Sequence, residues 1–251
     1  MLTLAKKLQQ LKAQLSQQLF PTQCLLCACT LHGDLLCGDC QYDLPHVYGK
    51  NICQQCGLAC NSLSYFCGHC LSNPPAFSHS FIPFAYEYPL DGLIHKFKYQ
   101  RHLTSGKLLG QLLADYLQYH AQDQDDWHTP DMIVPAPMHW LKRWQRGFNQ
   151  AEFLGKQVAR ALEIPFATHL IQRVQKTPAQ KELTRAARQH NLRKAFVIAD
   201  KHRAAIAGKH IALIDDVVTT TATARALSQL LLKSGAKEVQ IWALARTMSP
   251  K

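Results

Sequence analysis

The spacing of apolar residues predicts helices in several parts of the chain. Leucines three and four residues apart give residues 1–20 one apolar face, and the same period runs through residues 90–119. Two further helices are expected over residues 150–162 and 222–233, the second ended by Gly235 at a C-cap position. We expect residues 1–20 to pack on the neighbouring domain rather than on a membrane, because only three lysines enrich the polar face.

Short apolar runs predict strands between these helices. The aromatic-rich segment 77–88 alternates apolar and polar positions, which favours a strand or a hairpin. The other strand-like segments are residues 132–135, 211–214, 239–245 and short pieces within 166–200. Strands that alternate with helices are typical of an α/β fold with a mostly parallel sheet.

Length and composition limit the class of protein. A chain of 251 residues is long enough for one full-sized core and a small accessory domain, and Asn73-Pro74-Pro75 reads as the linker. The hydrophobic share of 47% excludes wholesale disorder, and no apolar run reaches the roughly 18 residues of a membrane-spanning helix. The polar start argues against a secretory signal peptide. We expect an amphipathic helix over 1–20, a small domain over 21–72 and the main domain over 76–251.

The net charge of +11 comes from one part of the chain. Residues 139–210 hold 15 Lys and Arg against 4 Asp and Glu, and the rest of the chain is neutral. A basic helical stretch is expected within this part, over residues 181–193. So many cations in one segment indicate a multiply charged anion or a polyanion as the partner.

The ten cysteines all lie between Cys24 and Cys70. A C-x-x-C turn places two thiolates on one side of a tight loop, and two such turns complete a tetrahedral zinc site. Four C-x-x-C pairs at regular spacing therefore predict structural zinc in a domain too small to fold without it. The expected ligands are Cys24, Cys27, Cys37, Cys40, Cys53, Cys56, Cys67 and Cys70.

Alternatives to two sequential zinc sites remain open from the sequence. Iron–sulfur clusters also use sets of four cysteines, although usually at other spacings, and redox chemistry would need a larger thioredoxin-like fold. Interleaved pairing or the loss of a site would change the zinc count, so one or two ions are expected. Cys29 and Cys60 are surplus, and we interpret both as small buried residues beside the metal.

The most informative segment is the one that follows the apolar run 211–214. Asp215 and Asp216 end that run, and a hydroxyl-rich loop leads into the helix expected from Ala222. Loop amides and a helix N-terminus form an anion site, and acids at the carboxyl end of a strand accept hydrogen bonds from a vicinal diol. The pattern therefore predicts a ribose 5-phosphate site. The alternative is a threonine-capped helix behind two solvated acids.

This segment resembles the phosphoribosyl pyrophosphate (PRPP) loop of type I phosphoribosyltransferases, whose pattern is D-D-V-x-T-T-G-x-T. The resemblance implies that Asp215 and Asp216 are the catalytic acids that hold the ribose hydroxyls, with Mg²⁺ bridging these hydroxyls and the pyrophosphate. It implies a PRPP-binding loop that comprises Val217, Val218, Thr219, Thr220, Thr221, Ala222 and Thr223. Thr221 stands where the family has Gly, and a threonine there costs about 1–2 kcal/mol if the position needs a positive φ.

Further motifs narrow the resemblance to the ComF/GntX family. They are R-G-F-N-Q-A from Arg146 to Ala151, a basic motif from Arg173 to Phe196, a lysine motif over 94–99 and the paired cysteines. The resemblance covers nearly the whole chain from Pro21. It implies a type I phosphoribosyltransferase-like α/β core, with a mostly parallel sheet, behind a small N-terminal four-cysteine zinc-ribbon domain.

The same resemblance implies partners and a place of action. It implies PRPP binding and a role in natural transformation, with single-stranded DNA and competence or DNA-processing proteins as partners. It places the protein in the cytoplasm, with the periphery of the inner membrane as an alternative.

Two sets of cations are candidates for the pyrophosphate. Cationic forks beside a strand end suit that ligand, and a basic loop could cover it. The candidates are Lys142, Arg143 and Arg146 in the first set and Arg173, Lys176 and Arg188 in the second. Trp140, Trp144 and Phe148 interleave with the first set, as stacking groups do in proteins that bind single strands. The alternative is that these three aromatic residues belong to the core.

Three functions remain open from the sequence. The protein could be a PRPP-binding protein that handles incoming single-stranded DNA, an active phosphoribosyltransferase with an unidentified acceptor, or a zinc-dependent adaptor with a vestigial PRPP site. Mg²⁺-dependent PRPP binding separates the first two from the third. A steep salt dependence of single-strand binding supports the first.

Overall fold

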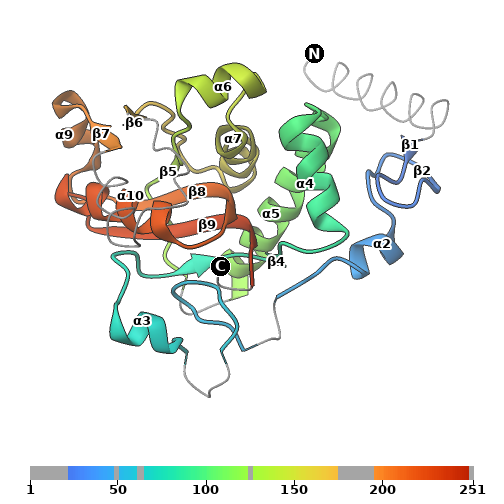
Figure 1. Ribbon diagram of the computed structural model, residues 1–251, viewed down its shortest axis with the longest axis horizontal. Helices are drawn as coiled ribbons and strands as arrows, with labels where there is room; N and C mark the ends of the chain where they lie inside the picture. The colour runs from blue at the N-terminus through green and yellow to red at the C-terminus, as the bar shows by residue number, and fades with distance from the viewer. Residues whose placement is uncertain (1–21, 48–50, 61–64, 124–126, 175–194, 249–251) are drawn as a thin grey trace, which may run out of the picture.

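The computed structural model describes residues 22–47, 51–60, 65–123, 127–174 and 195–248. A five-stranded sheet, parallel throughout, lies at their centre (Figure 1). Its strands are β3 (Ser80–Phe81), β4 (Phe84–Ala85), β5 (Met132–Pro135), β8 (His210–Val218) and β9 (Glu238–Arg246). β9 lies between β8 and the short strands β3 and β4, and β5 pairs with the other side of β8. The prediction of a parallel α/β sheet is confirmed.

Elements on both faces of the sheet bury its central strands. One face carries α4 (Leu90–Tyr99), α5 (Leu103–Asp123) and α7 (Gln150–Leu162), and the other carries α10 (Ala222–Lys233). Next to α10 lies an antiparallel pair of strands, β6 (Ile171–Arg173) and β7 (Phe196–Ile198). Because both faces are covered, β8 and β9 are almost continuous apolar runs.

The two cores are separated by the alternation of side chains along the strands. In β8, Ala212 and Ile214 face the helices α5 and α7, whereas Ile211 and Leu213 face α10. Three short helical elements lie outside these layers: α6 (Trp140–Arg146), η1 (Asp200–His202) and α9 (Arg203–Ile206). Among the described helices, none combines the length and the apolarity that crossing a membrane requires.

The cysteines belong to two small modules built in the same order. The first module, residues 22–47, holds the hairpin of β1 (Thr22–Gln23) and β2 (Thr30–Leu31) followed by α2 (Gly38–Tyr42). The second, residues 51–60 and 65–73, holds a bridge between Ile52 and Ala59 followed by α3 (Gly68–Ser72). Figure 1 shows α2 and α3 on separate sides of the molecule. The expected domain division at residues 73–75 stays a prediction.

Several expected elements differ in the structure. Of the two alternatives for residues 77–88, strands form but the hairpin is wrong, because β3 and β4 pair with β9 and not with each other. The residues with a helical period over 90–119 form two helices, α4 and α5, and not one. Arg101 lies between them at a φ of +55°. The helices expected over 1–20 and 181–193 lie outside the described residues.

Candidate functional site

The two adjacent acids lie inside strand β8 rather than after it. β8 continues to pair with β9 through Asp215 to Val218, so the strand is longer than the apolar run that predicted it. The backbone N–H groups of Asp216 and Val217 each donate to the carboxylate of the preceding residue, at 2.9 and 2.6 Å. These hydrogen bonds fix both carboxylates near the carboxyl end of the sheet.

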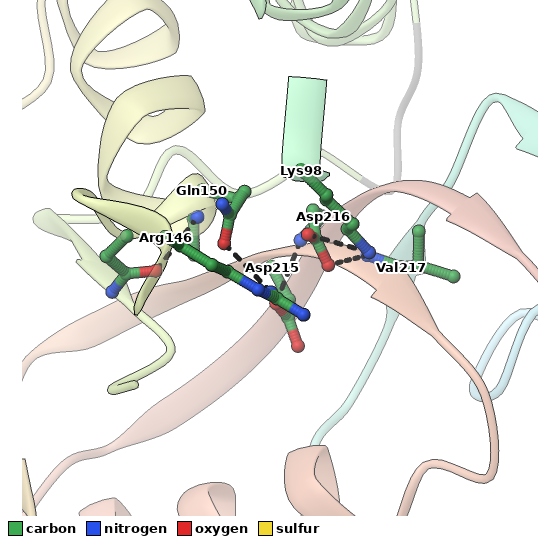
Figure 2. A network of polar contacts seen from close by, with 8 residues as sticks. Lys98, Arg146, Gln150, Asp215, Asp216 and Val217 are labelled. Atoms are coloured by element: carbon green, nitrogen blue, oxygen red, sulfur yellow. Dashed lines mark hydrogen bonds and ion pairs between the residues drawn. The ribbon is translucent and has the colours of Figure 1, made fainter. Parts of the chain in front are cut away.

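Three side chains from the α4–α7 side of the sheet point toward these acids (Figure 2). Lys98 Nζ, near the end of α4, lies 2.9 Å from Asp216 Oδ2, and both side chains are largely buried. Arg146 Nη1 donates to Gln150 Oε1 at 3.2 Å. Gln150 is 1% exposed, and its Nε2 has no hydrogen-bond partner among the described residues. A buried amide with an unused donor beside two carboxylates is available to a polar ligand.

The surroundings of Asp215 favour its protonated form. Burial, and after it the negative charge of Asp216, raises the pKa of Asp215 to about 7, against the opposing effects of the Asp216 N–H, Lys98 and Arg173. In the ligand-free protein Asp215 therefore holds a proton part of the time near neutral pH. A cation or a hydrogen-bond donor brought by a ligand would stabilise the charged form instead.

A pocket of about 390 Å³, counting its open mouth, lies beside the acids. Its apolar wall comes from β8, β9, α10 and the residue after β5, through Leu213, Ile241, Leu227 and Ala136. Its polar wall is the loop after β8 and the first turn of α10. That wall consists of Asp215, Val217, Val218, Thr219, Thr220, Thr221, Ala222 and Thr223. The residues of the predicted PRPP loop thus surround one pocket at the N-terminus of a helix.

Thr221 has the left-handed backbone that a glycine would adopt freely. At the N-cap of α10 its φ is +59° and its ψ −1°. The position therefore has the positive φ at which a threonine is strained and a glycine is not. The Oγ1 of Thr221 donates to the carbonyl of Thr220 at 2.6 Å and accepts from Arg225 Nε at 3.3 Å. These hydrogen bonds offset part of the roughly 1–2 kcal/mol that a left-handed threonine costs. Arg225 also donates through Nη2 to the carbonyl of Asn73 at 2.9 Å.

The cations of the first predicted set have different surroundings. Arg146 points toward the acids (Figure 2). Its guanidinium carbon lies 5.1 Å from the ring centre of Tyr99. Arg143 forms an ion pair with Glu152 at 3.3 Å, and Lys142 is exposed on α6. Of this set, Arg146 is therefore the one directed at the site.

The second set is only partly described. Arg173, half-buried at the end of β6, lies 5.4 Å from the ring centre of Phe196, and its charge acts on the carboxyl of Asp215. Burial lowers the pKa of Arg173, and the charge of Asp215 opposes that shift. Lys176 and Arg188 lie outside the described residues.

Arg246, the last residue of β9, connects the loop to the second cysteine module. The side chain is 2% exposed. Its Nε donates to the carbonyl of Cys56 at 2.8 Å, and its Nη1 donates to the carbonyls of Val218, at 3.0 Å, and Thr219. One buried guanidinium thus satisfies carbonyls from two parts of the chain.

The cysteine sulfurs gather in two clusters, each of which could hold a metal ion. The second contains Cys53, Cys56, Cys67 and Cys70, all within 4.8 Å of one another. The first contains Cys24, Cys27, Cys29 and Cys37 within the same limit. Cys40 also interacts with Cys37, Cys27 and Cys24. Four sulfur donors this close together fit tetrahedral coordination of one ion.

The surplus cysteines differ from each other. Cys60 is buried against the second cluster, as expected. Cys29 is exposed and its sulfur lies within the first cluster, so the interpretation as a buried spacer is wrong for it.

The three interleaved aromatic residues also divide into two kinds. Trp140 and Trp144 are 65% and 79% exposed on α6. Phe148 instead packs against Phe97 and Phe153, with ring centres 5.0 and 5.9 Å apart. The core interpretation holds for Phe148 and is wrong for the two tryptophans.

Comparison with known proteins places this geometry in a family. Residues 149–251 match the phosphoribosyl transferase domain. Competence protein F of Haemophilus influenzae is 34% identical over 90% of this chain and 98% of its own length. DNA utilization protein YhgH of Escherichia coli is 35% identical over 79% of this chain and 86% of its own length. Competence protein ComFC of Streptococcus pneumoniae is 26% identical over 89% of this chain and 100% of its own length.

The domain match contains the acids, their loop and β9, and the first two relatives extend the similarity over most of the chain. The parallel sheet with the acidic strand and the threonine loop agrees with that match. The chain therefore belongs to the ComF family and has a core of the phosphoribosyltransferase type.

Proposed function

We propose that this protein binds PRPP with Mg²⁺ at the carboxyl edge of its sheet and handles incoming single-stranded DNA during natural transformation. The observation that carries the PRPP site is the pair of acids on β8 beside a hydroxyl-rich loop at the start of α10. The relatives named for competence and for DNA utilization support the DNA role.

Each part of the site has a role in this proposal. The loop amides and the hydroxyls of Thr219, Thr220 and Thr223 hold the 5-phosphate. Asp215 and Asp216 hold the ribose hydroxyls. Carboxylate and hydroxyl oxygens are donors that Mg²⁺ accepts, so the residues fit the ion. When bound, Mg²⁺ neutralises charge on the pyrophosphate, and Arg146 is placed to add a cation there.

The proposal predicts that calorimetric titration of Mg²⁺–PRPP into the wild-type protein gives an affinity in the micromolar range. Thr221→Gly should bind with nearly the wild-type affinity, because the φ of +59° is already present without a ligand, so relief of its strain stabilises the free and the bound protein alike. Binding by the glycine variant alone would instead identify a vestigial site in a zinc-dependent adaptor. Titration without Mg²⁺ is the control.

We propose Zn²⁺ as the ion of both clusters, held by thiolates that a reducing cytoplasm would keep free. The two modules support an equivalent ligand set in each. The carbonyl that accepts from the first cysteine N–H belongs to Cys29 in the first module and to Leu58 in the second. Cys29 therefore corresponds to Leu58, which has no sulfur to bind a metal. Cys40 corresponds to Cys70, because each is the third residue of its helix.

Substitution of the two competing cysteines tests this ligand set. After dialysis against EDTA, Cys29→Ser should retain two zinc ions per chain and Cys40→Ser should retain one, because removal of a thiolate weakens a tetrahedral site. Elemental analysis of the purified proteins measures the count. The opposite pattern would make Cys29 the ligand, and one zinc in the wild-type protein would contradict the two-site proposal.

We propose that single-stranded DNA binds on the surface formed by α6 and the end of α4. Trp140 and Trp144 are one helical turn apart, so their exposed rings lie on one side of α6. Lys142 lies between them in the sequence but on another side of α6, and α6 contains no acidic residue. Arg146 joins this surface to the exposed ring of Tyr99. Exposed aromatic rings among cations suit bases and phosphates together.

Trp144→Ala should bind a dT oligonucleotide about tenfold more weakly, since stacking of one base is worth about 1–3 kcal/mol. The dependence of the affinity on salt should be unchanged, because no charge is removed. Tyr42→Ala is the matched control, as this ring is 86% exposed on α2. Fluorescence anisotropy of a labelled oligonucleotide measures the affinity of both variants and its dependence on salt. Equal affinities of the two variants would reject the surface.

A further inference from the structure

The second cysteine module and the PRPP loop are held by one buried arginine. Arg246 donates to the carbonyl of Cys56, whose sulfur belongs to the second cluster, and to the carbonyls of Val218 and Thr219 at the start of the loop. With the side chain 2% exposed, water has little access to replace a lost partner. The position of Cys56 therefore acts on the position of the loop.

Arg225 makes a second connection between the same two parts. Its Nη2 donates to the carbonyl of Asn73, the C-cap of α3, a helix that contains Cys70 and has Cys67 as its N-cap. Its Nε donates to Thr221 Oγ1 at the other end of the loop. The loop is thus tied to the second module at Thr219 through Arg246 and at Thr221 through Arg225.

The first module packs on a different part of the core. Its Cys24, Leu36 and Leu44 belong to the cluster of buried side chains that contains Leu90 and Leu93 of α4. Within the described ranges, both arginines that donate to the loop also donate to carbonyls of the second module, at Cys56 and Asn73. The two clusters therefore differ in their relation to the PRPP site.

We propose that the metal ion of the second cluster sets the affinity of the loop for its ligand, with Arg246 and Arg225 as positioning residues. This inference rests on the PRPP site proposed above. With the ion bound, the Cys56 sulfur is fixed and its carbonyl stays in place for Arg246. Without the ion, the turn that carries Cys56 opens, because metal binding supplies much of the folding energy of such a small module. The guanidinium then loses a partner, and the loop amides lose their fixed orientation toward the phosphate.

Removal of one sulfur from each module gives a matched test. Cys56→Ser and Cys27→Ser change equivalent positions, and each should lower the zinc content by one ion per chain. Cys56→Ser should weaken the binding of Mg²⁺–PRPP about tenfold, the size of one charge-assisted hydrogen bond. Cys27→Ser should keep the wild-type affinity within about twofold. Calorimetry measures the affinity and elemental analysis the zinc.

Arg246→Lys separates a local effect from misfolding of the module. Lysine keeps the charge but lacks the planar fork that reaches three carbonyls. This variant should keep both zinc ions and still lose about tenfold in affinity, and its combination with Cys56→Ser should lose no more than either change alone. Equal affinities of Cys56→Ser and Cys27→Ser, or additive losses in the double variant, would overturn the inference. Failure of the wild-type protein to bind PRPP would instead reject the proposed function.

Discussion

Replacement of both Asp215 and Asp216 by Asn should lower the affinity for Mg²⁺–PRPP by at least about 100-fold. Each carboxylate is expected to make a charged hydrogen bond to the ribose, worth about 1.5–3 kcal/mol, and the attraction to the bound ion is lost as well. Calorimetric titration of the double variant measures the loss.

The same double variant should remain folded. Each Asn Oδ1 can still accept the N–H of the following residue, as each carboxylate does now. Burial already favours the neutral form of Asp215, so a neutral amide there costs little. Lys98 loses its ion pair with Asp216, which we expect to cost about 3 kcal/mol because both side chains are largely buried, a loss smaller than the usual free energy of unfolding of a domain.

Asp200 provides the control for the loss of a carboxylate, because it is exposed and lies outside the site. Asp200→Asn changes an exposed acid whose ion pair with Arg203 lies outside the site, so its affinity should match that of the wild-type protein. Unchanged affinity of the double variant would remove both acids from the PRPP site.

Gly155→Val should destabilise the protein by about 3 kcal/mol and lower its Tm by roughly 6–12 °C. A Cβ at Gly155 would lie 2.5 Å from Phe166 Cε2 and 3.0 Å from Ile214 Cγ2. Phe166 cannot easily withdraw, because its segment bridges to Ile133 at the edge of the sheet. Helix α7 would have to move away from β8.

The exposed glycine of α4 provides the matched control. A Cβ at Gly92 would meet nothing within 4 Å, so Gly92→Val should change the free energy of unfolding by about 0.5 kcal/mol or less. Thermal unfolding followed by circular dichroism compares the two variants. Equal midpoints would show that the contact between α7 and β8 tolerates a larger separation.

Displacement of α7 would also reach the site. Asn149 caps this helix by accepting from the Ala151 N–H, and its Nδ2 donates to the carbonyl of Ala136 after β5. Gln150 follows at once and faces the acids (Figure 2). We therefore expect Gly155→Val to weaken PRPP binding as well as stability.

The parts of the site that follow one another in the chain could be predicted from the sequence. Asp215, Asp216 and the threonine loop are consecutive, and a strand, a turn and a helix determine their arrangement locally. The family pattern also marks Thr221 as the position where a glycine, and with it a positive φ, is possible. Its hydroxyl contacts with Thr220 and Arg225 were not expected, because they depend on the rotamer and on the neighbouring turn.

Contacts between distant segments could not be predicted in this way. The alternation over 77–88 indicates strands correctly, but it carries no information about their partner, which is β9. Lys98 and Gln150 stood in recognised motifs and were still not assigned to the site. Only the packing of α4 and α7 against one sheet brings them to the acids.

Exposure was the second property that the sequence left open. Trp140, Trp144 and Phe148 have the same helical spacing, yet Phe148 lies among core rings and the tryptophans face solvent. Whether an aromatic side chain is buried depends on what covers its helix. For α6 the described residues leave the tryptophan side open.

The place of β9 in the sheet has a consequence for synthesis on the ribosome. β9 is the last described strand in chain order, yet it pairs with β3 and β4, which emerge long before it. At translation rates of about 5–20 residues per second, these early strands wait roughly 8–30 seconds for their partner. Arg246, at the end of β9, also donates hydrogen bonds to the carbonyls of Val218 and Thr219 at the start of the loop. A nascent chain that stops short of β9 therefore carries both acids and every clustered cysteine, but not the arginine that joins the second module to the loop.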